Sequence, residues 1–210
     1  MSKQAILMSI RPQYVAKILN GEKTIEVRKK FPKDYVGWVY IYCTKGGENL
    51  TKLVHIGYEI LNNFELKNAT ELGDVLDVLN GKVVAKFWCD KVEEIECISV
   101  GDSDYGSLYA DTEYCTETLS EKELTQKSCV LPNEIFEYLD EDFDKVGYAI
   151  HISKLEVFEK PKELEDFKHW VEVWVYSGMD CPPYVDDELR SLYKAPQNWC
   201  YIYEEEHKKI

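Results

Sequence analysis

Four residues near the start of the chain combine charge and spacing in a way that could bind a polar ligand. They follow the pattern G-x-K-x-x-E-x-R, with Gly21, Lys23, Glu26 and Arg28. Lysine and arginine side chains can hold a carboxylate or a phosphate through charge-assisted hydrogen bonds. A glutamate beside them can accept from an exocyclic amine, as acidic side chains do with cytosine. The same charges could also form a mutually satisfied ion-pair network on an exposed strand.

The hydrophobic pattern predicts the elements that position these residues. Residues 5–10 form an apolar run that is typical of a strand buried on both faces. A short helix is expected next, beginning near Pro12 and ending at Gly21. Residues 24–28 alternate polar and apolar, which predicts a half-buried strand. The inward residues are Ile25 and Val27, and the outward ones are Thr24, Glu26 and Arg28.

Several further short strands are expected, with few helices between them. The strand patterns cover residues 38–44, 82–90, 146–158, 170–176 and 198–203. Residues 99–145 differ from these, because they are rich in Asp, Glu, Ser, Thr and Tyr. A capping box at Ser120 and Glu123 and a helical pattern over 133–139 predict that this segment is an acidic, largely helical insertion. The pattern as a whole favours a small barrel or a mixed sheet.

The charge of the chain is unevenly distributed. The 210 residues carry a formal net charge of -14, from 25 Lys and Arg against 39 Asp and Glu. A uniformly acidic surface is a poor non-specific binder of nucleic acid, because phosphates are neutralised by Lys and Arg. Residues 1–45, however, hold nine cations and three anions. Any nucleic-acid binding must therefore use this local basic segment, although the segment could also simply lie against the acidic remainder.

Cysteine usage and hydropathy predict a cytoplasmic location for the chain. No stretch of 18 apolar residues is present, so no membrane contact is expected, and the first 30 residues lack a signal-peptide core. The seven Cys include no C-x-x-C pair, and the four His show no paired ligand spacing. Reduced thiols are expected, and neither a metal nor a cofactor.

Two stretches of the sequence resemble a known family. Residues 9–28 read S-I-R-P-Q-Y-V-A-K-I-L-N-G-E-K-T-I-E-V-R, with an S-I-x-P entry at Ser9, Ile10 and Pro12. Together with G-x-K-x-x-E-x-R, this resembles the ASCH domain, a branch of the PUA-like superfamily. Residues 195–201 read A-P-Q-N-W-C-Y, which is similar to the Pro-Gln-x-Trp-x-Tyr ending of phage-type members. The resemblance covers both ends of the chain and much of its middle.

The resemblance implies an α+β fold with a small PUA-like β-barrel flanked by helices. Residues 1–210 would form a single domain, with residues 99–145 as the acidic insertion. The cleft would be lined by the G-x-K-x-x-E-x-R strand. PUA-like domains mostly bind RNA, so the expected partner is single-stranded RNA or a modified nucleotide. The expected ligand-binding residues are Ser9, Arg11, Lys23, Thr24, Glu26, Arg28, Lys29, Lys30, Trp199 and Tyr201.

An enzymatic function is the alternative. Some small bacterial ASCH proteins are amidohydrolases that remove the acetyl group from N4-acetylcytidine with a Lys, a Thr three residues later and a downstream acid. Lys23 matches that Lys, but Glu26 stands where the Thr would be, so the family's nucleophile is missing. A metal-independent hydrolase of the amidohydrolase or nuclease type, acting on a modified nucleoside or RNA, would use Lys23 and Glu26 as its catalytic residues.

A third hypothesis concerns protein partners. Outside residues 1–45, the chain carries 36 anions against 16 cations. The acidic insertion could therefore bind a basic protein partner or imitate the charge of a nucleic acid.

Overall fold

The computed structural model of the chain describes residues 3–46, 50–53, 60–61, 76–100, 111–139, 147–175 and 184–204. The chain divides into two compact units, which are described separately below. Unit 1 comprises residues 1–12, 38–86 and 156–210, and unit 2 comprises residues 13–37 and 87–155.

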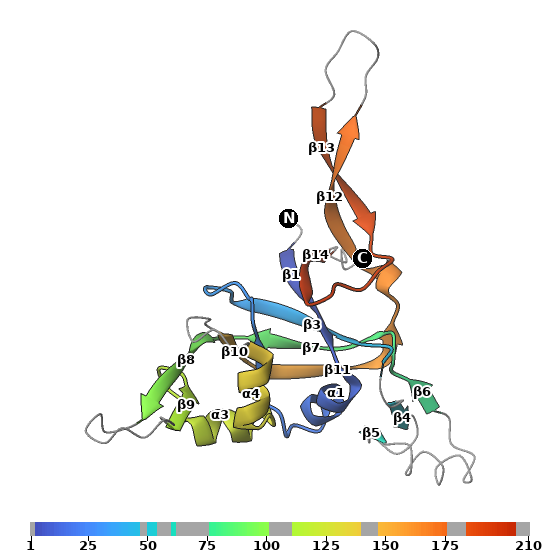
Figure 1. Cartoon of the computed structure of the whole chain (residues 1–210). Coiled ribbons are helices and arrows are strands. Elements are labelled where there is room, and N and C mark those ends of the chain that lie inside the picture. Colours follow the sequence, from blue (N-terminus) through green and yellow to red (C-terminus); the bar gives the residue numbers. More distant parts are fainter. Residues whose placement is uncertain are drawn as a thin grey trace. The chain divides into compact units, whose positions relative to one another are not determined.

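Unit 1 contains most of a seven-stranded sheet with the order β11-β7-β3-β1-β14-β12-β13 (Figure 1). The central strand β1 pairs in parallel with β3 and antiparallel with β14. Residues 5–10 of β1 are buried without interruption, as their continuous apolar pattern predicts. The strands are β1 (Lys3–Ile10), β3 (Gly37–Cys43), β7 (Val83–Cys89), β11 (Ser153–Lys162), β12 (Lys168–Val175), β13 (Tyr184–Ser191) and β14 (Trp199–Glu204).

The core of unit 1 lies against this sheet. Alternate residues of β1 and β3, such as Ala5, Leu7 and Tyr40, pack with Phe167 and Leu192. Phe167 directly follows a single 3-10 turn, η1 (Leu164–Asp166). A smaller sheet in the same unit has the order β5-β4-β6. Its strands are β4 (Thr51–Leu53), β5 (Ile60–Leu61) and β6 (Leu76–Val78).

Unit 2 is built on a four-stranded sheet with the order β2-β10-β8-β9, in which all pairs are antiparallel. The strands are β2 (Ile25–Arg28), β8 (Val92–Val100), β9 (Asp111–Cys115) and β10 (Gly147–His151). The helices in the described ranges are α1 (Pro12–Leu19), α3 (Glu121–Ser128) and α4 (Pro132–Leu139). Apolar residues of α3 and α4, including Leu124 and Ile135, pack with Val27 and Ala149 of the sheet.

Two local sequence signals mark helix ends as expected, one at the end of α1 and one at the start of α3. Gly21 has a φ of +77°, a left-handed conformation that glycine adopts without strain, and it stops α1. Ser120 and Glu123 form the predicted capping box, because each side chain meets the other residue's backbone N–H. The helix predicted over 133–139 is α4.

The sheet-dominated α+β class that the sequence predicts is confirmed. Within the predicted insertion, residues 111–139 contain strand β9 as well as α3 and α4, and both helices contribute to the core of unit 2. That residues 1–210 act as one domain, with 99–145 as an insertion, stays a prediction.

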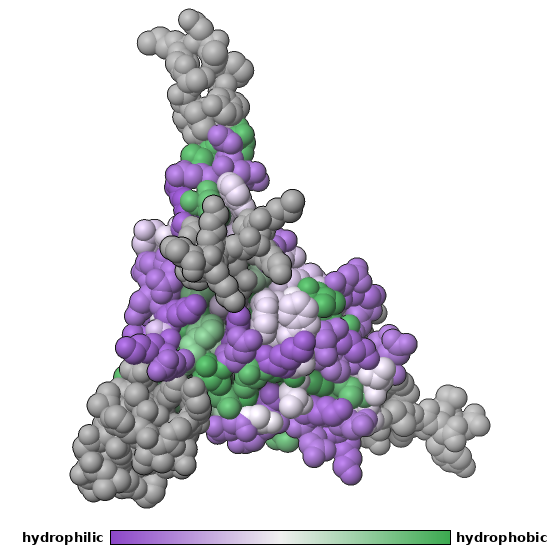
Figure 2. All heavy atoms as spheres, turned by 180° about the vertical axis from the view of Figure 1, so that it is seen from behind, coloured by the Kyte–Doolittle hydropathy of each residue, from purple (hydrophilic) through white to green (hydrophobic). Residues whose placement is uncertain are grey.

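Hydrophilic residues cover most of the described surface on the face that Figure 2 shows, and hydrophobic residues form a smaller patch there. No helix in the described ranges is long and apolar enough to cross a membrane. Five cysteines in these ranges are free thiols. They are Cys43, Cys89, Cys115, Cys129 and Cys200.

The close packing of α4 against β10 gives a test of the fold of unit 2. A Cβ added at Gly147 would lie 2.6 Å from Cδ2 of Leu139, a residue that is 4% exposed. Gly147→Ala is therefore expected to lower the free energy of unfolding by about 1–3 kcal/mol through overpacking. Urea denaturation followed by circular dichroism measures this change. Gly46→Ala is the control, because nothing lies within 4 Å of its added Cβ, and an equal loss in both variants would contradict the packing described here.

Candidate ligand-binding site

The residues of the G-x-K-x-x-E-x-R pattern meet in unit 2 and form one charged cluster. The Arg28 guanidinium lies 2.9 Å from Oε1 of Glu26, and the Lys23 ammonium lies 3.3 Å from Oε2 of the same carboxylate. Gly21 makes this possible, because its turn brings the chain from the end of α1 into β2. Each oxygen of Glu26 therefore faces one cation.

The cluster is buried, which differs from the half-buried strand expected from the sequence. Lys23, Glu26 and Arg28 are 2%, 5% and 8% exposed, and all four residues of β2 are buried. The inward direction of Ile25 and Val27 is confirmed, since both belong to the core under α3 and α4. The other face of β2 is covered too, because Lys23 and Arg28 lie across Glu26. The ion pairs of the alternative expectation are present, but they lie on a buried strand and not on an exposed one.

Helix α3 supplies the remaining contacts of Lys23. The Lys23 ammonium donates to the carbonyl oxygen of Ser128 at 2.5 Å, and the Thr24 backbone N–H donates to that of Lys127 at 2.8 Å. These carbonyls end α3, where backbone acceptors are left over and the helix dipole favours a cation. The Lys23 ammonium also lies 5.2 Å from the ring centroid of Tyr14, within the range of a cation–π contact.

The other predicted residues of unit 2 lie at its surface. Thr24, Lys29 and Lys30 are exposed. Lys29 and Lys30 directly follow β2, and the Lys29 ammonium lies 5.5 Å from the ring centroid of Tyr138 on α4. The buried cluster is thus continued along the chain by two exposed cations.

In unit 1 the S-I-x-P segment and the closing segment of residues 195–201 lie side by side. The Ser9 hydroxyl donates to the carbonyl oxygen of Pro196 at 2.6 Å, and the Ser9 backbone N–H donates to that of Asn198 at 2.9 Å. Trp199 and Tyr201 lie on β14 opposite Met8 and Ile6, with their ring centroids 5.4 Å apart. Trp199 is half-buried, whereas Tyr201 and Arg11 are exposed.

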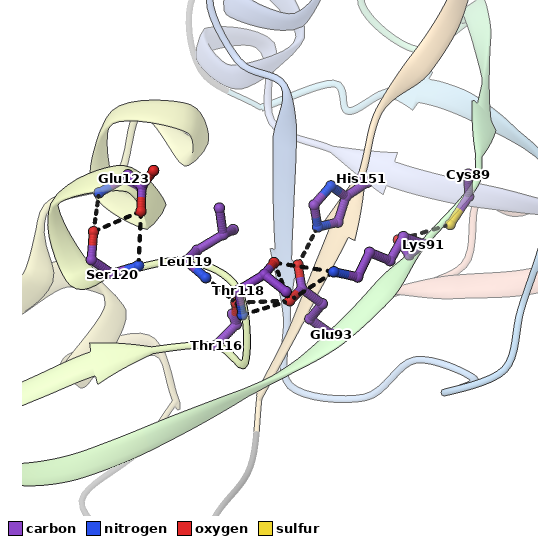
Figure 3. A network of polar contacts seen from close by, with 9 residues as sticks. All are labelled: Cys89, Lys91, Glu93, Thr116, Thr118, Leu119, Ser120, Glu123 and His151. Atoms are coloured by element: carbon purple, nitrogen blue, oxygen red, sulfur yellow. Dashed lines mark hydrogen bonds and ion pairs between the residues drawn. The ribbon is translucent and has the colours of Figure 1, made fainter.

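A second polar cluster in unit 2 surrounds Glu93, a residue that the sequence analysis did not identify (Figure 3). The Thr118 hydroxyl donates to Oε1 of Glu93 at 2.6 Å, and the Thr116 hydroxyl at 3.0 Å. The Lys91 ammonium lies 3.1 Å from the same oxygen. The other oxygen, Oε2, lies 2.5 Å from Nε2 of His151. Glu93 itself is 5% exposed.

The environment of Glu93 keeps its carboxylate charged. Burial by itself raises the pKa of this group, but hydrogen bonds from Thr118, His151, Lys91 and Thr116 outweigh it and lower the pKa to about 2. Two features of the sequence could have pointed to this site: Glu93 stands at an inward position of a strand pattern, and Thr116 and Thr118 precede the capping box.

The two polar clusters lie on opposite faces of the unit 2 sheet. Ala149 is paired with Val27 on one side and with Glu93 on the other, so these three residues share a face. Glu26 belongs to the next row, and alternation turns it to the other face. The face of Glu93 is the one that α3 and α4 cover, because Val27 and Ala149 belong to their core.

The described part of the chain contains no group of three His, Cys, Asp or Glu side chains that could hold a metal ion. The cation-rich cluster at Glu26 suits an anionic or amine-bearing ligand, and the cluster at Glu93 brings a carboxylate against an imidazole. The absence of a cofactor stays a prediction.

Comparisons with known proteins concern the fold only. No family model matches the sequence, and no curated protein matches it. The solved structure of an ASCH protein from Zymomonas mobilis is similar, with 12% identity over 76% of this chain and 73% of that chain, at a TM-score of 0.42. A point mutant of the Zymomonas protein matches with 13% identity over 77% of each chain, at a TM-score of 0.41. A likeness at this level assigns neither a ligand nor a binding residue.

The lowered pKa of Glu93 predicts how stability depends on pH. The pKa is about 2 in the folded chain against an ordinary value of 4.5. The group therefore stabilises the fold fully above pH 4.5, and this contribution of about 3 kcal/mol is lost as the pH falls from 4.5 toward 2. We expect the unfolding free energy of Glu93→Gln to depend less on pH in this window than that of the wild type. Glu137→Gln, at an exposed position of α4, is the control, and parallel curves for Glu93→Gln and wild type would contradict the prediction.

Proposed function

We propose that the chain is an ASCH-type nucleic-acid-binding protein that holds single-stranded RNA or a modified nucleotide at the cluster of Lys23, Glu26 and Arg28. The observation that carries this proposal is the burial of all three charges within one small unit. Removing an ion from water costs several kcal/mol, and a buried ion pair often stabilises a fold no better than apolar residues of the same size. Such a cluster is therefore weak evidence for a role in stability alone, and we take it as the candidate binding site.

The chemistry of the cluster fits a nucleotide. Glu26 can accept from the exocyclic amine of a base, while Arg28 and Lys23 can donate to a carbonyl or phosphate oxygen. The exposed Lys29 and Lys30 follow at once along the chain and can neutralise backbone phosphates. In unit 1, Tyr201 is 37% exposed and offers a ring on which an unpaired base can stack.

Local charge reconciles this proposal with an acidic chain. The net charge of -14 disfavours adsorption of a polyanion over the whole surface. Binding would then be confined to the basic segment of residues 1–45 and would weaken as salt increases.

The exposed lysines provide a test that leaves the buried cluster intact. We expect Lys29→Gln combined with Lys30→Gln to weaken binding of a fluorescein-labelled single-stranded RNA of mixed sequence. The slope of log Kd against log salt concentration should fall by about 1.4, since each phosphate contact on a single strand contributes about 0.7. Fluorescence anisotropy at several salt concentrations measures both quantities. The control is Lys122→Gln combined with Lys127→Gln on α3, which removes the same charge elsewhere.

The role of the buried cluster is tested separately with Arg28→Lys. This change keeps the charge but removes the planar guanidinium fork, so affinity should fall while circular dichroism stays unchanged. The proposal fails if wild-type protein binds no RNA or nucleotide at low salt, or if both lysine pairs reduce binding equally.

One observation favours a metal-independent hydrolase as a second candidate. The ring of His151 is partly exposed, and its Nε2 lies against the buried, charged carboxylate of Glu93. A carboxylate in this position orients an imidazole as a general base. The free ring nitrogen would take a proton from water as the oxygen attacks an acyl carbon, and would return it to the leaving amine. Glu26 is less suited to this step, because both its oxygens already face cations.

Turnover assays decide this candidate. The substrates are N4-acetylcytidine, further acylated nucleosides and single-stranded RNA, each assayed with EDTA present. We expect any turnover to be lost in His151→Gln and kept in Lys122→Gln. If turnover is lost in Glu26→Gln alone, the general base is Glu26 and not His151. No turnover of any substrate by the wild type would eliminate the hydrolase.

A further inference from the structure

Helix α3 connects the two polar clusters of unit 2. The turn that leads into its first residue is bonded to Glu93, and its last carbonyl oxygens accept from Lys23 and Thr24. An eight-residue helix is only about 12 Å long. The contacts at its two ends therefore act on one short, stiff element.

At the N-terminal end, Glu93 fixes the turn by three donors. Its Oε1 accepts from the hydroxyls of Thr116 and Thr118 and, at 3.1 Å, from the Thr118 backbone N–H. Thr116 in turn accepts the Leu119 N–H on its hydroxyl at 3.0 Å and donates its own N–H to the Leu119 carbonyl at 2.9 Å. The residue after Leu119 is Ser120, which caps the helix. No loose segment therefore separates the carboxylate from the first turn of α3 (Figure 3).

At the C-terminal end, the Ser128 carbonyl defines where the Lys23 ammonium lies. Ser128 is fully buried, and the distance to Nζ is 2.5 Å. An ammonium has three N–H donors. The Ser128 carbonyl and the Glu26 carboxylate use two of them, and the Tyr14 ring lies 5.2 Å from the ammonium, so the position of Ser128 helps to set how the ammonium is directed.

We propose that Glu93 is a positioning residue for the ligand-binding cluster, acting through α3 on the ammonium of Lys23. This inference rests on the proposed function, in that the cluster is taken to be the site of nucleotide binding. Glu93 lies on the opposite face of the sheet from Glu26, so its effect on the ligand is indirect. Without its hold on the turn, the start of α3 keeps mainly the hydrogen bond that the Tyr114 N–H donates to the Glu121 carboxylate and apolar packing, which is not directional.

The proposal competes with a simpler explanation, in which the core alone holds α3. Leu119 and Leu124 are 5% and 0% exposed and pack under the helix. Thr118→Val separates the two explanations, because it removes a donor to Glu93 at an exposed position and leaves both leucines in place. Thr118→Ser keeps the hydroxyl and should restore wild-type behaviour.

The first measurement reports on Lys23 without any ligand. Acetylation by an N-hydroxysuccinimide ester, followed by peptide mass spectrometry, gives the reaction rate of each lysine. We expect Lys23 to react slowly in the wild type and in Thr118→Ser, and about tenfold faster in Thr118→Val and in Thr116→Val, a coupling of ordinary size. Lys122, on the exposed side of α3, serves as the internal reference.

The second measurement is the affinity for the labelled single-stranded RNA. We expect it to fall about tenfold in Thr118→Val and to return in Thr118→Ser, with circular dichroism unchanged. Glu134→Ala is the matched control, since it removes a similar side-chain acceptor of the Leu131 N–H at the start of α4, a helix for which the described ranges show no contact with Lys23. An unchanged Lys23 reaction rate in a folded Thr118→Val overturns the positioning role. If the wild type binds no RNA, the proposed function fails, while the acetylation rates still decide whether Glu93 positions Lys23.

Discussion

A charged carboxylate inside a protein must be surrounded by donors, and unit 2 is organised around two such groups. Glu93 is satisfied by a lysine, a histidine and a threonine-rich turn, and Glu26 by a lysine and an arginine. Neither set of donors comes from one element. The donors of Glu93 come from the segment before β8, from β10 and from the turn before α3, so the charge can be buried only when these segments have assembled. Satisfying these buried carboxylates therefore depends on the same assembly of segments that forms the fold.

The alternation of side chains across the sheet then separates the two carboxylates. Val27, Ala149 and Glu93 form one row and face the helices, whereas Glu26 lies in the next row and faces away from them. One face of the sheet therefore carries the apolar core together with Glu93, and the other face carries the charged cluster around Glu26. Helix α3 belongs to the first face by its packing, and its last carbonyl, that of Ser128, accepts from the lysine of the second.

Lys23 illustrates why a buried lysine can be stable here. Its ammonium meets a carboxylate, the Ser128 carbonyl at the negative end of a helix and the face of an aromatic ring. Each of these stabilises a cation by a different mechanism, through charge pairing, through leftover backbone acceptors and through the ring quadrupole. Together they offset the loss of hydration that burial imposes.

The sequence by itself determined the elements that rest on local signals. The continuous apolar run of β1, the glycine stop at Gly21 and the capping box at Ser120 depend on residues close together in the chain, and all three were predicted correctly. The tertiary structure alone decided the burial of β2 and the site at Glu93. An outward-pointing Glu26 is indistinguishable from a solvated one until Lys23 folds over it. Glu93 meets Thr118 across 25 residues and His151 across 58, and no periodic pattern encodes partners at such separations.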